Sequence, residues 1–281
     1  MRPSRPSRTA LRVALRRAAH QIYDARPLIL DDPIAVPILG SNYAEELRKT
    51  ATRLHKPHSV ALRAFLVARS RYAEDTLALA IQRGVTQYVL LGAGLDTFAY
   101  RNPYPQLHVY ELDFPATQHA KRALLQQNNI PIPTNLTYVP IHFEQHAISE
   151  QLLAVGFNPG APTLFAWLGV VPYLTLEAFR ATVRFIAASP HGGGVVLDYG
   201  LPRTALPPLE QLAHDSLAER VALAGEPFQL FFTPAEIAAE LTAFQHIEDL
   251  GSPEINARYF TDRTDRLATL GTAARILSAQ L

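Results

Sequence analysis

Short apolar segments of β-strand length alternate with longer amphipathic segments between residues 88 and 199. The predicted strands are Tyr88–Leu91, Leu107–Leu112, Leu136–Ile141, Thr163–Leu168 and Val195–Tyr199. The predicted helices between them are Pro115–Asn128, Ser149–Val155 and Thr175–Ala188. Strands separated by helices of this length predict right-handed βαβ units. The sequence therefore predicts an α/β fold, with a mostly parallel sheet that carries helices on both faces.

Two regions outside this alternation suggest additions to the sheet. Residues 1–84 precede the first predicted strand and read as a helical cap, in which Val60–Arg83 is the clearest helix. The proline-rich segment 201–232 surrounds an amphipathic stretch, Gln211–Ala224, and follows the fifth strand. An insertion at that point lies above the carboxyl edge of a parallel sheet, so we expect it to form a lid over a substrate.

The end of the chain is expected to complete a seven-stranded sheet. A helix is predicted over Pro234–Phe244, and His246–Leu250 and Ala257–Phe260 are predicted as the last two strands. Residues 85–281 then form one Rossmann-like domain.

Composition excludes several classes of protein. A formal net charge of +1 argues against a dedicated nucleic-acid binder. The chain has no cysteine, hence no disulfide, no thiolate nucleophile and no cysteine-ligated metal. It has no apolar run of the ~20 residues that a membrane-spanning helix needs, and its first twenty residues do not resemble a signal peptide. A cytoplasmic protein is the expectation.

Arginines are frequent near the N-terminus. A nucleic-acid or membrane-surface arm is conceivable, but we interpret this region as a solvated helix face with a frayed tail. The residues are Arg2, Arg5, Arg8, Arg12, Arg16 and Arg17.

The most informative motif is the glycine turn after the first predicted strand. Gly92 and Gly94 follow Tyr88–Leu91, and two acidic residues, Glu111 and Asp113, come about twenty residues later. Glycines let a backbone approach a ligand closely, and a carboxylate at that distance accepts hydrogen bonds from ribose hydroxyls. The pattern predicts a site for a nucleoside-containing cofactor.

Details of the turn favour S-adenosylmethionine over a nicotinamide dinucleotide. A dinucleotide fingerprint calls for a third glycine near position 97, where this chain has Thr97. Asp96 would also place a second anion beside a pyrophosphate at one helix N-terminus. S-adenosylmethionine has the ribose without a phosphate, and its cationic groups tolerate nearby carboxylates.

These motifs, in this order, resemble the leucine carboxyl methyltransferase family, and more closely its bacterial branch of S-adenosylmethionine-dependent methyltransferases. The resemblance covers nearly the whole chain. Its motifs are Arg26-Pro27-Leu28, Asp31-Asp32-Pro33, Ala68–Tyr72, Leu91–Thr97 with Tyr100-Arg101, Tyr110–Pro115 with Lys121, Trp167–Val170, Tyr173-Leu174, Gly225–Phe228 and Arg258–Phe260. It implies a class I methyltransferase fold.

The resemblance also implies roles for individual residues. Arg69 would meet the carboxylate of the methionine moiety, with Arg71 as the alternative, because a guanidinium fork suits a carboxylate. Gly92, Gly94 and Asp96 would surround the same end of the cofactor, and Asp113 with Glu111 would hold the ribose. His142 and Phe143 would flank the adenine, and Leu168 would lie near the reactive methyl group.

Two positions depart from the eukaryotic members of that family. Those enzymes have an acid where this chain has His142 and a glutamate where it has Leu168. The second departure removes a charge near the cofactor, so it argues against a protein C-terminal leucine as the acceptor.

Each residue that could lie beside the methyl acceptor has two interpretations. Tyr173 and Trp167 are either core aromatics or lie beside the acceptor, and Tyr173 is the candidate for the substrate pocket. Arg258 either pairs with a carboxylate in the lid or orients an acidic substrate. No residue stands out as a general base.

We do not expect a metal site. His142 and His146 are four residues apart with Glu144 between them, but the sequence offers no third ligand and no His-Glu-x-x-His pattern.

The expected function is methyl transfer from S-adenosylmethionine to a carboxylate or hydroxyl of a small molecule. The expected partners include neither nucleic acid nor a membrane, and a homodimer is compatible with the sequence. Two alternatives remain: a nicotinamide-dependent oxidoreductase on a similar fold, and a cofactor-binding protein without catalysis.

Overall fold

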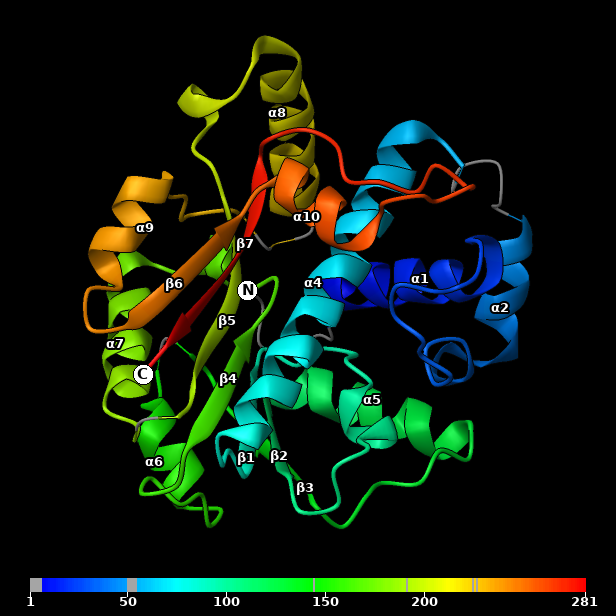
Figure 1. The fold of residues 1–281 in the computed structure, drawn as a ribbon. Helices are drawn as coiled ribbons and strands as arrows, with labels where there is room; N and C mark the ends of the chain where they lie inside the picture. Colours follow the sequence, from blue (N-terminus) through cyan, green and yellow to red (C-terminus); the bar gives the residue numbers. More distant parts are fainter. Residues whose placement is uncertain (1–6, 50–54, 144, 191, 224, 226) are drawn as a thin grey trace.

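A computed structural model describes residues 7–49, 55–143, 145–190, 192–223, 225 and 227–281. Seven strands of this part of the chain form one sheet in the order β3-β2-β1-β4-β5-β7-β6 (Figure 1). The neighbours from β3 to β5 pair in parallel, and β7 runs antiparallel to β5 and to β6. The predicted mostly parallel, seven-stranded α/β sheet is confirmed. The strands are β1 (Gln87–Leu91), β2 (His108–Asp113), β3 (Leu136–Pro140), β4 (Thr163–Trp167), β5 (Gly194–Gly200), β6 (Gln245–Leu250) and β7 (Ala274–Gln280).

Helices cover both faces of the sheet. One apolar layer joins α6, α7 and α9 to side chains such as Leu91, Phe165 and Leu197. The other joins α4 and α10 to side chains such as Leu90 and Val196, which point to the opposite face. The helices are α1 (Arg8–Tyr23), α2 (Gly40–Lys49), α4 (Pro57–Gln82), α5 (Pro115–Gln127), α6 (Ile148–Leu153), α7 (Leu176–Ala187), α8 (Pro208–Leu223), α9 (Pro234–Glu240) and α10 (Ser252–Tyr259), with short 3₁₀ turns at Pro37–Leu39, Phe98–Arg101, Val171–Tyr173 and Arg203–Ala205.

Local sequence explains where the helices begin. Pro57 and Pro115 stand in the first turns of α4 and α5, where their missing N–H groups would have no partner anyway. The Thr175 hydroxyl accepts a hydrogen bond from the Ala178 N–H at 3.2 Å and caps α7.

The last strand was assigned wrongly from the sequence. The segment Ala257–Phe260 belongs largely to α10, which starts with a proline in its first turn and a Glu254 carboxylate that accepts the Gly251 N–H at 2.9 Å. The seventh strand is β7, in which Ile276 and Leu277 are both fully buried. A strand between two others, with both faces covered, shows no apolar alternation, and this explains why the pattern missed it.

The N-terminal helix is less solvated than predicted. Ala14, Arg17, Ala18, Ala19 and His20 of α1 are buried, and α1 packs on α4 and α2. The interpretation as a solvated helix face therefore holds for Arg8 and Arg12, which are exposed, and is wrong for the buried Arg17. Arg2 and Arg5 lie outside the described residues, as do Glu144, Glu226 and Ala224, the last residue of the predicted segment Gln211–Ala224.

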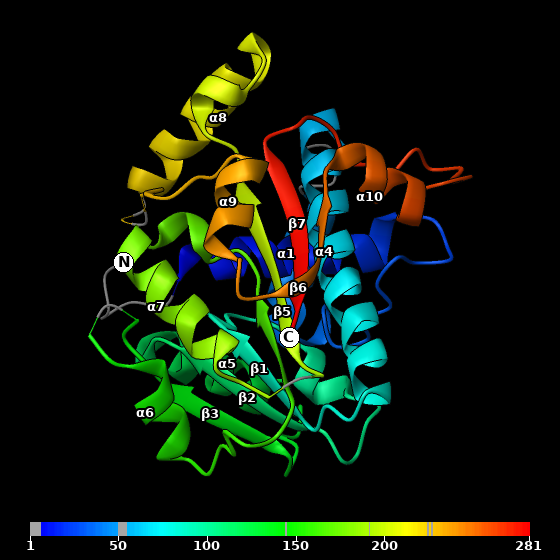
Figure 2. The same ribbon diagram turned by 60° about the vertical axis from the view of Figure 1, so that its left-hand side comes forward.

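Helix α8 differs from the other helices in its surroundings. It projects beyond the sheet at the upper left of Figure 2, and Val221 is its one buried residue in the described part of the chain. No helix among the described residues has the length and apolar character needed to cross a bilayer.

Candidate functional site

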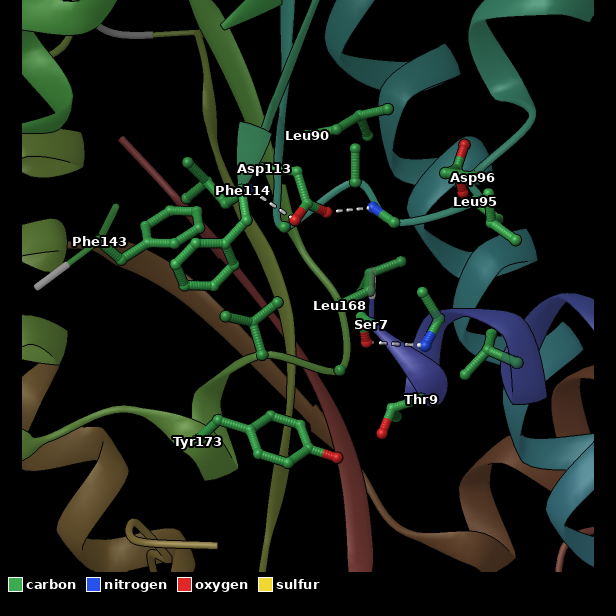
Figure 3. Close-up of a pocket in the computed structure, with 18 of the residues that line it drawn as sticks. Ser7, Thr9, Leu90, Leu95, Asp96, Asp113, Phe114, Phe143, Leu168 and Tyr173 are labelled. Atoms are coloured by element: carbon green, nitrogen blue, oxygen red, sulfur yellow. Dashed lines mark hydrogen bonds between the residues drawn. The ribbon is translucent and has the colours of Figure 1, made fainter. Parts of the chain in front are cut away.

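A cavity of about 250 Å³ opens at the carboxyl ends of β1, β2 and β4. It is lined by the glycine loop after β1, the start of α5, the loop after β4 and one face of α1 (Figure 3). Predicted site residues that line it are Arg69, Gly92, Gly94, Asp96, Asp113, His142, Phe143, Leu168 and Tyr173.

The glycine loop is held in place by close contacts. Gly92 has φ +71°, and its N–H donates to the Leu112 carbonyl at 2.8 Å. A Cβ atom on Gly92 would lie 2.4 Å from Val170 Cγ2, in the loop after β4. Gly94 has φ +54°, and a Cβ there would lie 3.1 Å from Ala10 Cβ on α1. Because Gly92 and Gly94 have no Cβ atom, Val170 and Ala10 can pack closely against the loop, and room is left for a ligand.

Asp113 stands at the end of β2 with its carboxylate fixed by backbone groups. It accepts hydrogen bonds from the Gly94 N–H and, at 2.7 Å, from the Phe114 N–H. Burial raises the pKa of Asp113 to about 6, against the lowering effect of these two bonds. The carboxylate joins the glycine loop to the adjacent strand and faces the cavity, where further hydroxyl donors can reach it.

Asp96 faces an arginine rather than open space. Its carboxylate is 3.0 Å from Arg17 Nη1 and accepts the Phe98 N–H at 2.7 Å. Arg17 also contacts Asp32 at 2.6 Å and the Thr97 hydroxyl at 2.6 Å. Burial alone would raise the pKa of Asp96, but the Arg17 charge holds it below its usual value. Asp96 therefore ties α1 to the glycine loop.

Arg69 enters the cavity from α4 with a carboxylate beside it. Its Nη1 is 2.8 Å from Asp198 on β5, and both side chains are buried. Asp198 also accepts the Gly169 N–H, and a Cβ on Gly169 would lie 2.9 Å from the guanidinium. Among the described residues this pairing uses one nitrogen, so the other N–H groups can reach a carboxylate. Arg71, the alternative, is exposed and pairs with Asp75.

Aromatic side chains form the side of the cavity beyond Asp113. The rings of Phe114 and His142 are 5.3 Å apart, and those of Phe114 and Phe143 are 6.3 Å apart. Figure 3 shows Phe114 and Phe143 beside Asp113, and Tyr173 reaching into the cavity from the opposite end. Flat apolar rings next to a carboxylate that can accept from hydroxyl groups suit a purine nucleoside.

Two predicted residues do not line this cavity. Glu111 lies behind Asp113, paired with the buried Lys121 at 2.6 Å. Burial raises the pKa of Glu111 to about 7, although Lys121 opposes the shift. Arg258 lies on α10 and binds the Glu248 carboxylate of β6, at a smaller second hollow that also includes Tyr72 and Asp75. Trp167 is a core residue that stacks on Phe179.

The sequence did not place α1 at this site. Ser7, Thr9, Ala10, Val13, Ala14 and Arg17 line the cavity, together with Pro227 and Gln229 from the segment after α8. The four-residue spacing of Ala10, Ala14 and Ala18 marks a small-residue face that can lie close to other backbone, and it was the available signal.

A metal site is not apparent in the described part of the chain, where no group of three or more acidic or histidine side chains is arranged to hold an ion. The His142 N–H donates to His146 Nδ1 at 3.3 Å, and Glu144 lies outside the described residues.

Comparison with known proteins agrees with this geometry. The sequence profile of the leucine carboxyl methyltransferase family matches residues 10–187. A Bacillus subtilis protein named "Putative S-adenosyl-L-methionine-dependent methyltransferase YktD" is 33% identical to the chain, over 97% of each sequence. A Saccharopolyspora erythraea protein with the same description is 28% identical, over 97% of this chain and 94% of that one.

Solved structures share the fold at low sequence identity. The crystal structure of a "putative methyltransferase" from Thermobifida fusca has a TM-score of 0.59 and 16% identity, over 99% of this chain and 96% of that one. This likeness supports the class I methyltransferase architecture and no more. The profile match and the full-length relative together establish that the chain belongs to the leucine carboxyl methyltransferase family.

Proposed function

We propose that the protein binds S-adenosylmethionine in the cavity and transfers its methyl group to an oxygen of a small molecule. The observation that carries the proposal is that Arg69, Gly92, Gly94 and Asp113, from three separate segments, line a single cavity. The relatives' names supply the cofactor, and family membership supplies the reaction class.

The residues fit this cofactor from one end to the other. Asp113 presents a fixed carboxylate to the ribose hydroxyls, and Phe114 and Phe143 offer apolar rings to the adenine. The guanidinium N–H groups of Arg69 that Asp198 does not use suit the methionine carboxylate. Leu168 and Tyr173 remain at the end where the methyl acceptor enters.

Bound S-adenosylmethionine supplies an activated methyl group on a sulfonium. The acceptor oxygen forms the new C–O bond while the C–S bond breaks and its electron pair stays on sulfur. The protein's part is to align the acceptor and to exclude water. A carboxylate acceptor releases no proton and needs no base, whereas a hydroxyl must lose its proton. Among the described lining residues, Asp96 and Asp113 are already engaged as acceptors, which favours a carboxylate or an easily ionised hydroxyl.

We further propose that residues 1–84 act as a cap and segment 201–232 as a lid over the acceptor. Pro227 and Gln229 of that segment line the cavity, as do residues of α1. The Gln229 N–H also donates to the Pro172 carbonyl at 2.7 Å, which ties the lid to the loop after β4.

Calorimetric titration with S-adenosylhomocysteine tests the cofactor assignment. We expect micromolar binding to the wild type and a loss of about tenfold or more in Asp113→Ala, because a charged hydrogen-bond acceptor is removed. Asp75→Ala, at the second hollow, is the matched control and should keep the wild-type affinity. Unchanged affinity in Asp113→Ala would overturn the site assignment.

The same titration with NADH and NADPH separates the oxidoreductase alternative. Binding of a nicotinamide in place of S-adenosylhomocysteine would reverse the proposal. A protein that binds S-adenosylmethionine and never releases S-adenosylhomocysteine with any carboxylate or phenol acceptor would point to the alternative without catalysis.

A further inference from the structure

Three arginines, two on α1 and one at the end of α8, are close enough to interact electrostatically. Arg12 and Arg16 lie one turn apart on α1, and Arg16 Nη1 donates to the Arg12 carbonyl at 3.1 Å. Arg220 belongs to the last turn of α8 and interacts electrostatically with Arg16. Two segments more than 200 residues apart in sequence thus bring positive charge to one place. We call Arg12, Arg16 and Arg220 the arginine cluster.

Among the residues that the structure describes, the arginine cluster lacks the counter-ions that other arginines have. Arg17 contacts Asp32 at 2.6 Å, Arg63 contacts Asp24 at 2.6 Å, and Arg69 contacts Asp198 at 2.8 Å. Within the described residues, no carboxylate lies within ion-pair distance of any member of the cluster. Because the whole chain carries a net charge of only +1, this concentration is local rather than a general basic surface.

Arg16 shows the clearest sign of a missing partner. Its Nε atom is buried and finds no hydrogen-bond acceptor within the described part of the chain. Burial and the charges of Arg12, Arg220 and Arg63 all lower the pKa of Arg16. A buried donor and an uncompensated charge are both unfavourable, and a bound anion would satisfy both.

The arginine cluster is next to segments that line the cavity, although its three members are not among the lining residues. Val13 lines the cavity, and Arg16 is three residues further along α1, on the same side of the helix. Arg220 precedes Pro227 and Gln229, the lid residues that line the cavity. Tyr173, at the end of the cavity where we propose that the acceptor enters, packs its ring against Phe228 of the lid at 5.3 Å.

We infer that the methyl acceptor is an anionic small molecule whose carboxylate or phosphate group is bound by Arg12, Arg16 and Arg220. This inference rests on the proposed function, because it names the substrate class of that site. Guanidinium groups bind both anions through paired N–H donors. Because Arg220 lies on α8 and Arg16 on α1, an anion between them also links the lid to the cap.

Calorimetry with malonate and with inorganic phosphate tests the anion site directly. The protein is saturated with S-adenosylhomocysteine, and each probe is titrated at constant ionic strength. We expect saturable binding to the wild type and binding weakened by about tenfold or more in Arg16→Gln and in Arg220→Gln. Arg203→Gln is the control, because Arg203 lies at the start of the same lid but is already paired with Asp215. Tighter binding of malonate indicates a carboxylate, and tighter binding of phosphate a phosphate.

Three results would overturn the inference. The first is an absence of saturable binding, and the second is equal weakening in Arg203→Gln. The third is weaker binding of S-adenosylhomocysteine in Arg16→Gln, which would assign the arginines to the cofactor. Titration of S-adenosylhomocysteine into the same variants keeps the two proposals separate: its affinity should be unchanged in Arg16→Gln. If the wild type binds the anions as expected but not S-adenosylhomocysteine, the proposed function fails and the anion site stands.

Discussion

The end of the sheet at the cavity and segment 201–232, the proposed lid, hold their charged residues in different ways. Near the cavity, Arg69 and Asp198 form a buried pair with side chains 10% and 9% exposed. In the proposed lid, Arg203 and Asp215 form a pair with side chains 50% and 46% exposed. The first pair is built into the sheet, and the second lies in solvent.

Two glycines of the cavity also differ from a glycine that follows α6. Gly92 and Gly94 have protein atoms within 3.1 Å of where a Cβ would stand, while Gly156 has nothing within 4 Å. The two ion pairs indicate a fixed end of the sheet at the cavity, where we propose that the cofactor binds, and an adaptable end at segment 201–232, where we propose that the acceptor binds. A protein family built this way can keep one cofactor while its lid changes to suit different acceptors.

Removing one member of each ion pair is expected to give the largest difference in the free energy of unfolding. Asp198→Ala leaves the Arg69 guanidinium buried without its partner, so we expect the free energy of unfolding to fall by about 3–5 kcal/mol. Asp215→Ala breaks an exposed pair and should leave the urea midpoint unchanged. Urea unfolding of both variants measures the difference.

Asp198 also accepts the Gly169 N–H. A further variant, Asp198→Asn, removes the charge but keeps an accepting oxygen and the shape of the side chain. It should recover part of the stability lost in Asp198→Ala. Equal losses in Asp198→Ala and Asp215→Ala would contradict the distinction between a fixed end and an adaptable end.

Glycine substitutions provide a smaller contrast. Gly92→Ala combines a positive φ with a Cβ 2.4 Å from Val170 Cγ2, so we expect a loss of about 2–4 kcal/mol in unfolding free energy. Gly156→Ala has a similar φ of +85° but open space around it, so the strain alone should cost about 1 kcal/mol. Thermal and urea unfolding of both variants check the expectation. A similar loss in the two would mean that Val170 moves away at no cost.

Sequence reasoning found the part of the site that is local in the chain. Gly92 and Gly94 follow their strand directly, and Asp113 ends the next one, so periodicity and spacing were sufficient. Arg69 required the family resemblance, because nothing near it in sequence marks it as different from Arg71.

Contacts between distant segments could not be predicted. Arg69 and Asp198 are 129 residues apart, and no local pattern links them. The position of α1 over the glycine loop depends on Ala10 meeting Gly94, which is a property of packing rather than of periodicity. Arg258 was expected either to pair with a carboxylate in the lid or to orient an acidic substrate. In the structure it lies on α10, which replaced the predicted strand, and pairs with Glu248 of β6.

The pH dependence of the unfolding free energy also compares these two regions of the molecule. Burial raises the pKa of Glu111 from 4.5 to about 7, so the folded protein holds a proton there that the unfolded chain releases. Stability contributed by this site therefore falls as pH rises from about 4.5 to about 7, and is constant beyond those limits. Glu111→Gln does not titrate. Its unfolding free energy relative to the wild type should increase across that window by an amount on the order of 1–3 kcal/mol.

Asp215→Asn on the lid is the matched control for this pH effect. Hydrogen bonding to Arg203 lowers the pKa of Asp215 from 3.8, so the carboxylate is ionised in both the folded and the unfolded chain above about pH 5. Its difference from the wild type should therefore be flat between pH 5 and pH 7, where that of Glu111→Gln rises. Denaturant titrations at half-unit intervals of pH distinguish the two. A flat or falling difference for Glu111→Gln would mean that Lys121 compensates the buried carboxylate fully. The cofactor end would then owe its rigidity to packing around Gly92 and Gly94 rather than to its charges.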